Sequence, residues 1–335
     1  MRSVGDRLDW ETDGRDWPNR GASRFVQAGG LRWHVQRAGP AATVTVECAT
    51  GAAGATDAAA AIGTASGGSR AAGATGAPVA LLLHGTGAST HTWRDLLPRL
   101  AARFDVIAPD LPGHGFTGPA VANGWSLPAF ARGVDALLTA LGASPAVIVG
   151  HSAGAAVAAR WALDATRPPA SIVSLNGAFV PLGGPAGQLL APVARLIAGN
   201  PLVPRLFSWH AGDRAVLQRL IDSTGSRLDA RGVELYGRLV RSPAHAASAL
   251  RMMAAWELAP LERALPGLRV AVELVAGASD RTVAPSQARR VAARLPHARV
   301  TVLPGLGHLA HEEDPECIER IVLRAACGAG VLSAD

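Results

Sequence analysis

Six short, continuous apolar segments recur along the chain from residue 79 onward. They occupy residues 79–85, 104–110, 146–152, 171–177, 270–277 and 299–305. Unbroken apolar runs of this length are typical of strands buried on both faces, because a strand with one wet face alternates apolar and polar side chains. Helical patterns separate most of the runs. The sequence therefore predicts an α/β fold with a mostly parallel central sheet flanked by helices.

The segment before these runs predicts two further features. Residues 24–35, RFVQAGGLRWHV, contain two alternating stretches around a Gly-Gly pair, which is the pattern of a β-hairpin. Residues 40–77 are rich in Ala, Gly, Thr and Ser and have no periodicity. We expect this low-complexity stretch to be a surface insertion, since loop-closure entropy grows only slowly with length.

One long interval interrupts the alternation of strands and helices. Residues 178–266 carry helical patterns and no convincing strand, which predicts a helical lid inserted after the fourth parallel strand. Such a layer would cover the carboxyl ends of the strands, where open α/β sheets bind ligands. We therefore expect a core in two parts, residues 1–177 and 267–335, with the lid between them.

The segment GHSAG at residues 150–154 follows one of the predicted strands and leads into an Ala-rich helix. An abrupt turn from strand to helix strains the backbone of its central residue, and only small neighbours such as Gly150 and Gly154 avoid collisions there. Ser152 would stand at the helix N-terminus, where backbone N–H groups favour developing negative charge. The motif predicts that Ser152 is a nucleophile; a loop serine that caps the helix is the structural alternative.

A serine needs a base and an orienting acid to become an effective nucleophile. Asp280 follows the predicted strand at residues 270–277, and His308 follows the last predicted strand. The order Ser152, Asp280, His308, with both partners at strand ends, is the order that a nucleophile elbow requires. We expect His308 to transfer the proton and Asp280 to fix the tautomer of its ring.

Other residues compete for these two roles. His311 is a second potential base, but its neighbours Glu312 and Glu313 indicate a solvated position at the start of a helix. Asp314 and Asp110 are lesser candidates for the acid. We expect the first to be an exposed helix cap and the second to organise a turn.

An oxyanion hole needs two backbone N–H donors aimed at one oxygen. Ala153 supplies one by its position after Ser152, and the loop HGTGAS at residues 84–89 supplies the other through Thr86. Gly85 in this loop lets the backbone approach a substrate. A plain tight turn is the alternative interpretation of the loop.

Composition and charge exclude several classes of function. The chain has a formal net charge of +6 and all its basic side chains are arginines, but these are scattered among acidic residues, so we expect no nucleic-acid partner. The charged N-terminal segment lacks the apolar core of a signal peptide. Cys48, Cys317 and Cys327 form no disulfide or metal-binding pattern. We expect no cofactor, no metal site and no transmembrane segment.

The motifs HGTGAS, DLPGHG, GHSAG, GASD and GLGH stand in an order that resembles the α/β-hydrolase superfamily. More distinctive segments, among them LNGAFVP, ALRMMAAW and LPGLGHLAHEEDP, resemble the magnesium-chelatase accessory hydrolases of bacteriochlorophyll synthesis. Residues 40–77 and Ala284 depart from that family. The resemblance implies an α/β-hydrolase fold, a role in tetrapyrrole metabolism in the cytoplasm or at the membrane surface, and magnesium chelatase subunits as partners.

The predicted lid carries large apolar side chains that could hold a hydrophobic substrate, a tetrapyrrole among the candidates. We expect the substrate-binding residues to be Gly85, His151, Phe207, Trp209, Met252 and Trp256. For the lid side chains, attachment of the lid to the core is the alternative.

Two functions remain open: a serine hydrolase acting on an ester or related acyl bond, and a catalytically silent porphyrin-binding or chelatase accessory protein. Epoxide hydrolysis is disfavoured, because those relatives need an aspartate where this chain has Ser152.

Overall fold

The structure is a computed structural model and describes residues 7–40, 76–120, 124–181, 200, 202–210 and 213–333. The predicted low-complexity insertion therefore lies almost entirely outside the described residues, together with Cys48. Part of the predicted lid lies outside them as well. Of Phe207 only the backbone is described.

The centre of the described structure is an eight-stranded sheet with the order β1-β2-β4-β3-β5-β6-β7-β8. Strands β3 to β8 pair in parallel, whereas β2 pairs antiparallel with both β1 and β4. The strands are β1 Ser23–Ala28, β2 Leu31–Ala38, β3 Val79–Leu83, β4 Asp105–Pro109, β5 Pro145–His151, β6 Ser171–Leu175, β7 Ala271–Gly277 and β8 Ala298–Leu303. Each predicted apolar run coincides with one of the strands β3 to β8 to within two residues at either end, which confirms the predicted fold class.

The inner parallel strands are largely apolar because helices cover both faces of the sheet, whereas the edge strand β8 is only partly buried. In β3, Leu81 and Leu83 belong to one hydrophobic cluster, while Ala80 and Leu82 belong to another. Successive side chains of a strand point to opposite faces, so the two clusters lie on the two sides of the sheet. Full burial of one such leucine stabilises the fold by roughly 1.5–3 kcal/mol.

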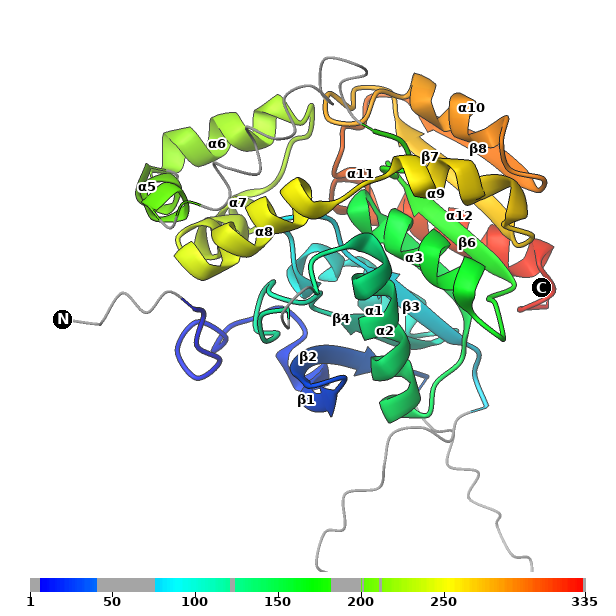
Figure 1. Cartoon of the computed structure of the whole chain (residues 1–335), viewed down its shortest axis with the longest axis horizontal. Helices are drawn as coiled ribbons and strands as arrows, with labels where there is room; N and C mark the ends of the chain where they lie inside the picture. The colour runs from blue at the N-terminus through cyan, green and yellow to red at the C-terminus, as the bar shows by residue number, and fades with distance from the viewer. Residues whose placement is uncertain are drawn as a thin grey trace, which may run out of the picture.

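Two groups of helices complete these clusters. On one face lie α2 (Leu127–Leu141), α3 (Ala153–Asp164) and α10 (Ser286–Ala292). The other face is covered by α1 (Leu96–Leu100) and α12 (Pro315–Gly328). Figure 1 shows α2 and α3 in front of the strands and α12 behind them. This sandwich of helix, sheet and helix holds the carboxyl ends of the parallel strands at one edge of the molecule.

The N-terminal pair of strands forms the predicted hairpin. β1 and β2 pair antiparallel with Ala28 opposite Leu31. Gly29 and Gly30 make the turn with φ angles of 55° and 75°. Two consecutive residues in this left-handed region form the turn whose twist matches the flanking strands, which is why the Gly-Gly pair is needed.

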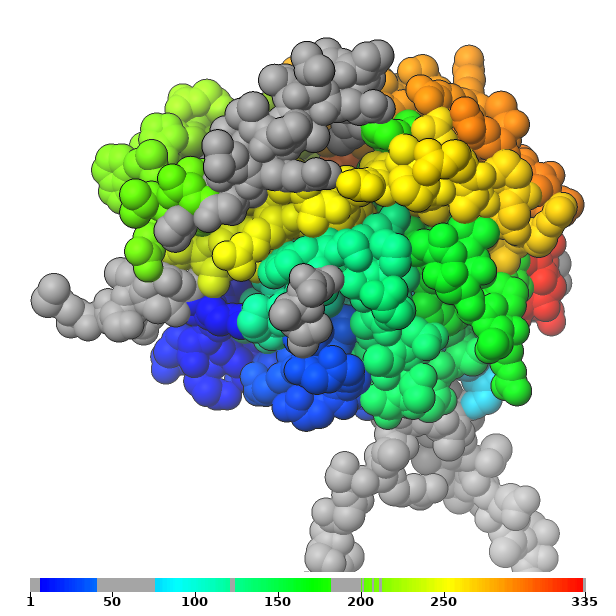
Figure 2. All heavy atoms as spheres, viewed as in Figure 1, coloured from blue at the N-terminus to red at the C-terminus, as the bar shows by residue number. Residues whose placement is uncertain are grey.

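The described chain between β6 and β7 is helical, and we call this part the helical insertion. It contains α5 (Leu202–His210), α6 (Arg214–Ser223), α7 (Ala230–Val240), α8 (Pro243–Ala255), α9 (Ala259–Ala264) and the 3₁₀ turn η3 (Leu265–Gly267). Helices α5 to α8 form a group beside the sheet in Figure 1, and α8 and α9 form a continuous yellow band across the face shown in Figure 2. Within the described ranges, no helix has the length and apolar character to cross a membrane.

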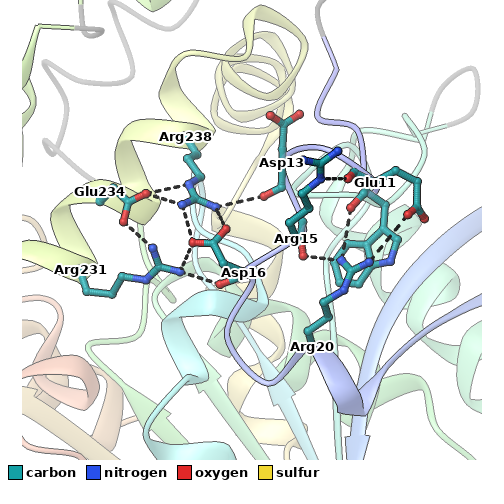
Figure 3. Close-up of polar contacts among 10 residues, drawn as sticks. Glu11, Asp13, Arg15, Asp16, Arg20, Arg231, Glu234 and Arg238 are labelled. Atoms are coloured by element: carbon teal, nitrogen blue, oxygen red, sulfur yellow. Dashed lines mark hydrogen bonds and ion pairs between the residues drawn. The ribbon is translucent and has the colours of Figure 1, made fainter.

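The N-terminal arm, residues 7–22, connects the core to α7. Trp17 of this arm is buried. The carboxylate of Asp16 lies between the guanidinium groups of Arg231 and Arg238, as Figure 3 shows. Hydrogen bonds from Arg238 and then Arg231 hold the pKa of Asp16 below its ordinary range. The arm therefore attaches the helical insertion to the core by charge pairing.

Candidate active site

Ser152 occupies the sharp turn between β5 and α3. Its φ and ψ angles are 50° and −115°, which is a strained conformation for any residue other than glycine. A Cβ atom at Gly154 would lie 2.0 Å from the carbonyl oxygen of Leu83, and one at Gly150 would lie 2.6 Å from Ala155 Cα. Both flanking glycines are therefore required by close backbone packing.

The side chain of Ser152 does not cap the helix that it precedes. Its backbone is instead fixed from β6 and the loop that follows: Ser152 N–H donates to the Leu175 carbonyl at 2.9 Å, and Ala178 N–H donates to the Ser152 carbonyl at 3.1 Å. The strained turn is therefore held by hydrogen bonds from outside itself. The capping serine that the sequence left as an alternative does not match this geometry.

His308 and Asp280 form a buried hydrogen-bonded pair. The distance between His308 Nδ1 and Asp280 Oδ2 is 2.8 Å, and the side chains are 8% and 0% exposed. A carboxylate only accepts hydrogen bonds, so Nδ1 carries the proton and Nε2 is free to act as a base. This is the tautomer that proton abstraction from a serine requires.

The carboxylate of Asp280 is fully engaged by donors. Its Oδ1 accepts from the backbone N–H groups of Thr282 and Val283 at 2.7 and 2.9 Å. Its Oδ2 accepts from Asn176 Nδ2 at 2.7 Å as well as from His308. The carboxylate is thus fixed in orientation before any substrate binds.

Asn176 was not singled out from the sequence. It follows β6 in the left-handed conformation, with φ 49°, and this turn directs its amide to Asp280. Asparagine tolerates this backbone region better than most residues, so an Asn at a strand end was the available signal. Nothing local to the sequence could identify the carboxylate that it meets.

The loop of His308 and the strand of Ser152 meet at the edge of the sheet. The ring of His151 lies 4.8 Å from the ring of His308, centroid to centroid, and His151 Nε2 donates to the His308 carbonyl at 2.9 Å. In the described structure no hydrogen bond joins Ser152 Oγ to the His308 ring. Such contacts are often loose until a substrate tightens the site.

The loop after β3 lies against the same edge. A Cβ at Gly85 would lie 2.8 Å from His151 Nδ1 and 3.1 Å from Ser152 Cβ, so this loop packs directly on the Ser152 turn. Among the hydrogen bonds of the described residues, none uses the backbone N–H of Thr86 or of Ala153. These two backbone donors, both close to the Ser152 turn, are therefore unused within the described protein.

The helical insertion contacts this loop through α8. Thr86 Oγ1 donates to Met252 Sδ at 3.5 Å, and Met252 is fully buried. His245, which the sequence analysis did not single out, bonds the Gly87 carbonyl through Nε2 at 3.0 Å. Burial lowers the pKa of His245 to about 4, so this ring is neutral at physiological pH.

The remaining predicted substrate contacts are placed differently. Trp256 is partly buried and packs edge-on against Phe130 of α2, with ring centroids 5.6 Å apart. Trp209 is 78% exposed on α5. The side chain of Phe207 lies outside the described residues. Trp256 thus matches the alternative of attachment to the core, whereas most of the Trp209 side chain faces solvent.

His311 is not solvated, contrary to the expectation from its acidic neighbours. It is 1% exposed, its Nε2 hydrogen bonds Thr92 Oγ1 at 2.6 Å, and its ring packs 4.4 Å from that of His151. Burial lowers its pKa to about 3. Glu312 is buried too, because Arg94 forms an ion pair with it inside the protein. The polar neighbours of His311 indicate a surface position, but Thr92 and Arg94, which satisfy this segment inside the protein, are remote from it in sequence.

The two lesser candidates for the acid have structural surroundings. Asp110 is buried and accepts from Thr90 N–H at 2.6 Å and Phe116 N–H at 2.9 Å, and it pairs with His34. Asp314 is half-buried and caps α12 by accepting from Cys317 N–H. Neither forms a hydrogen bond to His308 within the described structure. Likewise, no group of three or more His, Cys, Asp or Glu among the described side chains could hold a metal ion.

Residues 80–316 match the model of the alpha/beta hydrolase family. The chain therefore belongs to the alpha/beta hydrolase family. Its relatives include the magnesium-chelatase 30 kDa subunit of Rhodobacter capsulatus, which is 41% identical over 247 residues, covering 73% of this chain and 86% of that protein.

Two solved structures show the same fold at low identity. A candidate lipase from Acinetobacter baumannii aligns with a TM-score of 0.71 and 16% identity, covering 97% of this chain and 99% of that one. A meta-cleavage product hydrolase from Pseudomonas fluorescens aligns with a TM-score of 0.67 and 19% identity, covering 91% and 98%. At these identities the likeness establishes the fold alone.

Proposed function

We propose that the protein is a serine hydrolase that cleaves an ester or related acyl bond of a hydrophobic substrate. Ser152 is the nucleophile, His308 the base and Asp280 the acid that orients it. The observation that carries the proposal is the buried His308–Asp280 hydrogen bond of 2.8 Å beside a serine held at φ 50°. A strained backbone at a non-glycine residue persists only where the surrounding structure enforces it.

The proposed reaction begins when His308 Nε2 takes the proton of the Ser152 hydroxyl. The serine oxygen attacks the acyl carbon, and the backbone N–H groups of Thr86 and Ala153 receive the negative charge of the tetrahedral oxygen. His308 then passes the proton to the leaving alkoxide, and water releases the acyl group by the same steps in reverse order. Asp280 stabilises the imidazolium that forms in each half-reaction.

The substrate region that we propose lies where α8 meets the loop after β3. Gly85 and His151 pack at the Ser152 turn, and Met252, buried against Thr86, supplies a flexible apolar side chain that can repack around a hydrophobic ligand. Trp256, which follows α8 and packs on Phe130 of α2, is included in the proposal as the residue next to that helix. Trp209 of α5 belongs to the proposal as an exposed residue that a substrate would meet from solvent, and Phe207 is included on the sequence alone.

We further propose a role in magnesium-tetrapyrrole metabolism, with bacteriochlorophyll synthesis as the pathway. The support is the relative named as a magnesium-chelatase 30 kDa subunit. The substrate would then be a tetrapyrrole ester, the partners the other subunits of magnesium chelatase, and the place of action the cytoplasm or the membrane surface. The protein itself needs no metal ion or cofactor for this chemistry.

The same name favours a second candidate, a catalytically silent accessory protein that binds porphyrin or chelatase. The activity of a variant without the Ser152 hydroxyl distinguishes the two candidates. Turnover of p-nitrophenyl butyrate by the wild type and by Ser152→Ala tests the hydrolase, and the variant should lose nearly all activity. Equal rates in the two proteins would reject catalysis at Ser152. Pigment synthesis supported fully by Ser152→Ala in cells would favour the silent accessory role.

A further inference from the structure

A group of buried polar side chains lies beneath the proposed active site and is not used by the mechanism above. We call it the Glu312 cluster: Thr92, Arg94, Tyr236, His311 and Glu312. At the centre of the cluster lies Glu312, whose side chain is 0% exposed. Its members come from three places: the 3₁₀ turn η2 (Thr90–Trp93) and the residue after it, α11 (Ala310–Glu313), and α7. The cluster therefore joins the helical insertion to the two loops that form the site.

The hydrogen bonds of the cluster have a defined direction. Tyr236 Oη and Thr92 Oγ1 both donate to Glu312 Oε1, at 2.8 and 2.6 Å. Arg94 donates to the other oxygen, Oε2. Burial raises the pKa of Glu312, and these donors act in the opposite direction by stabilising its carboxylate. Glu312 is thus an acceptor at both oxygens and is satisfied only when all its donors are in place.

This direction fixes the tautomer of His311. Because Thr92 uses its one proton on Glu312, its oxygen can only accept from His311, so the proton of His311 is on Nε2. The other nitrogen, Nδ1, has no partner among the described residues. His311 is therefore held as a neutral ring in a single orientation.

The ring of His311 connects the Glu312 cluster to His308, the proposed base. It packs 4.4 Å from the ring of His151, and His151 donates to the backbone carbonyl of His308 at 2.9 Å. A carbonyl oxygen only accepts, so the proton of His151 is on Nε2. A continuous set of contacts thus runs from Tyr236 of α7 to the backbone of His308.

Tyr236 is the member of the cluster that belongs to the helical insertion. Its ring packs beside Leu217 and Val233 in the small hydrophobic cluster of α6 and α7. It also lies 4.5 Å from the ring of His91 of η2. A displacement of α7 would withdraw the Tyr236 hydroxyl from Glu312 and leave a buried carboxylate one donor short.

We infer that Tyr236 is a positioning residue, which acts through Glu312, Thr92 and His311 to align His308 when α7 is docked on the core. The inference rests on the proposed function and deepens it, since it makes correct placement of the base depend on the helical insertion. Binding of a substrate that holds α7 in place would then favour the aligned imidazole. Coupling of this kind through packed and hydrogen-bonded side chains commonly changes rates by about 3- to 30-fold.

Tyr236→Phe removes the hydroxyl and keeps the ring. We expect kcat for p-nitrophenyl butyrate to fall by about 3- to 30-fold with KM changed less than about twofold, because the variant disturbs the base and not the binding surface. Thr92→Val should have the same effect, whereas Thr92→Ser, which restores the hydroxyl, should recover most of the rate. Thr139→Val on the exposed side of α2 is the matched control and should match the wild type.

A second readout does not depend on turnover. The His308 Nδ1 proton, bound to Asp280, should give a far-downfield proton NMR resonance that is absent from Asp280→Asn. We expect Tyr236→Phe and Thr92→Val to shift or broaden this resonance. Unchanged kcat and an unchanged resonance in both variants would overturn the inference while leaving the proposed hydrolase intact. A wild type without turnover would reject the hydrolase instead, and the resonance would still show whether Tyr236 and His308 are coupled.

Discussion

Replacement of Asp280 by asparagine tests the orientation of the proposed base. In the wild type, Oδ1 accepts from two backbone N–H groups and Oδ2 accepts from His308 and Asn176. An asparagine that keeps its oxygen toward the backbone donors places its NH₂ group where Oδ2 was. That group would face two donors, the His308 ring and the Asn176 amide.

The His308 ring can relieve this opposition of donors in only one way. His308 can accept from the new NH₂ group only by moving its own proton from Nδ1 to Nε2, and a ring protonated at Nε2 cannot take the proton of Ser152. Loss of the correct tautomer costs about 10⁴-fold in kcat where it has been isolated in a serine hydrolase triad. The Asn176 amide would lose its 2.7 Å bond to Asp280 and keep only the longer one to the Gly307 carbonyl, at 3.4 Å. This loss should also destabilise the fold by about 1–3 kcal/mol.

The assay is kcat/KM for p-nitrophenyl butyrate, with thermal unfolding measured on the same samples. Asp314→Asn is the matched control, since Asp314 caps α12 and does not meet His308 in the described structure. We expect the control to keep its activity. An Asp280→Asn variant within tenfold of the wild type would refute the reasoning from the hydrogen bonds, even if its Tm fell as expected.

Three further predictions follow from the packing and the charges. Gly154→Ala should lower Tm by an amount that corresponds to at least about 1–3 kcal/mol, because the new Cβ would lie 2.0 Å from the Leu83 carbonyl oxygen; an unchanged melting curve would contradict the geometry. The pKa values of His311 and His245 are lowered from 6.5 to about 3 and about 4, so their contribution to stability is complete above pH 6.5 and is lost as the pH falls toward those values. Urea unfolding at pH 7 and pH 5 should therefore show a smaller free energy of unfolding at pH 5. A larger free energy of unfolding at pH 5 than at pH 7 would contradict this role of the two rings. Asp16→Ala should cost less than about 1 kcal/mol, and less still in high salt, because its ion pairs with the insertion are half exposed; a large, salt-independent loss would show that the arm has another role.

The fold could be predicted from the sequence because its signal is local. A strand buried on both faces must be largely apolar, and the runs of the inner strands show this without reference to the rest of the chain. The last run, with Arg299 and Thr301, is the edge strand β8 and is only partly buried, contrary to the expectation of burial on both faces. The signal of the turn at Ser152 is local as well, since Gly150 and Gly154, the two glycines that close backbone packing requires, flank it in the sequence. The order of the strand ends then placed Asp280 and His308 at the same edge of the sheet, where the structure joins them.

The surroundings of these residues could not be predicted, because their partners are remote. Asn176 and Asp280 are 104 positions apart, and Thr92 and Glu312 are 220 positions apart. Glu312 and His311 looked solvated because a run of polar residues usually marks a surface, and only the fold shows that Arg94 and Thr92 satisfy them inside. Trp209 illustrates the reverse case, since a large apolar side chain does not reveal which face of its helix meets solvent.

The central claim is that Ser152 is a nucleophile activated by His308. The most direct measurement is peptide mapping by mass spectrometry after reaction of the native protein with a fluorophosphonate, which labels activated serines. The account predicts one adduct, on the peptide that contains Ser152, and its loss in His308→Gln. Adducts absent from that peptide, or formed equally fast without the His308 imidazole, would contradict it.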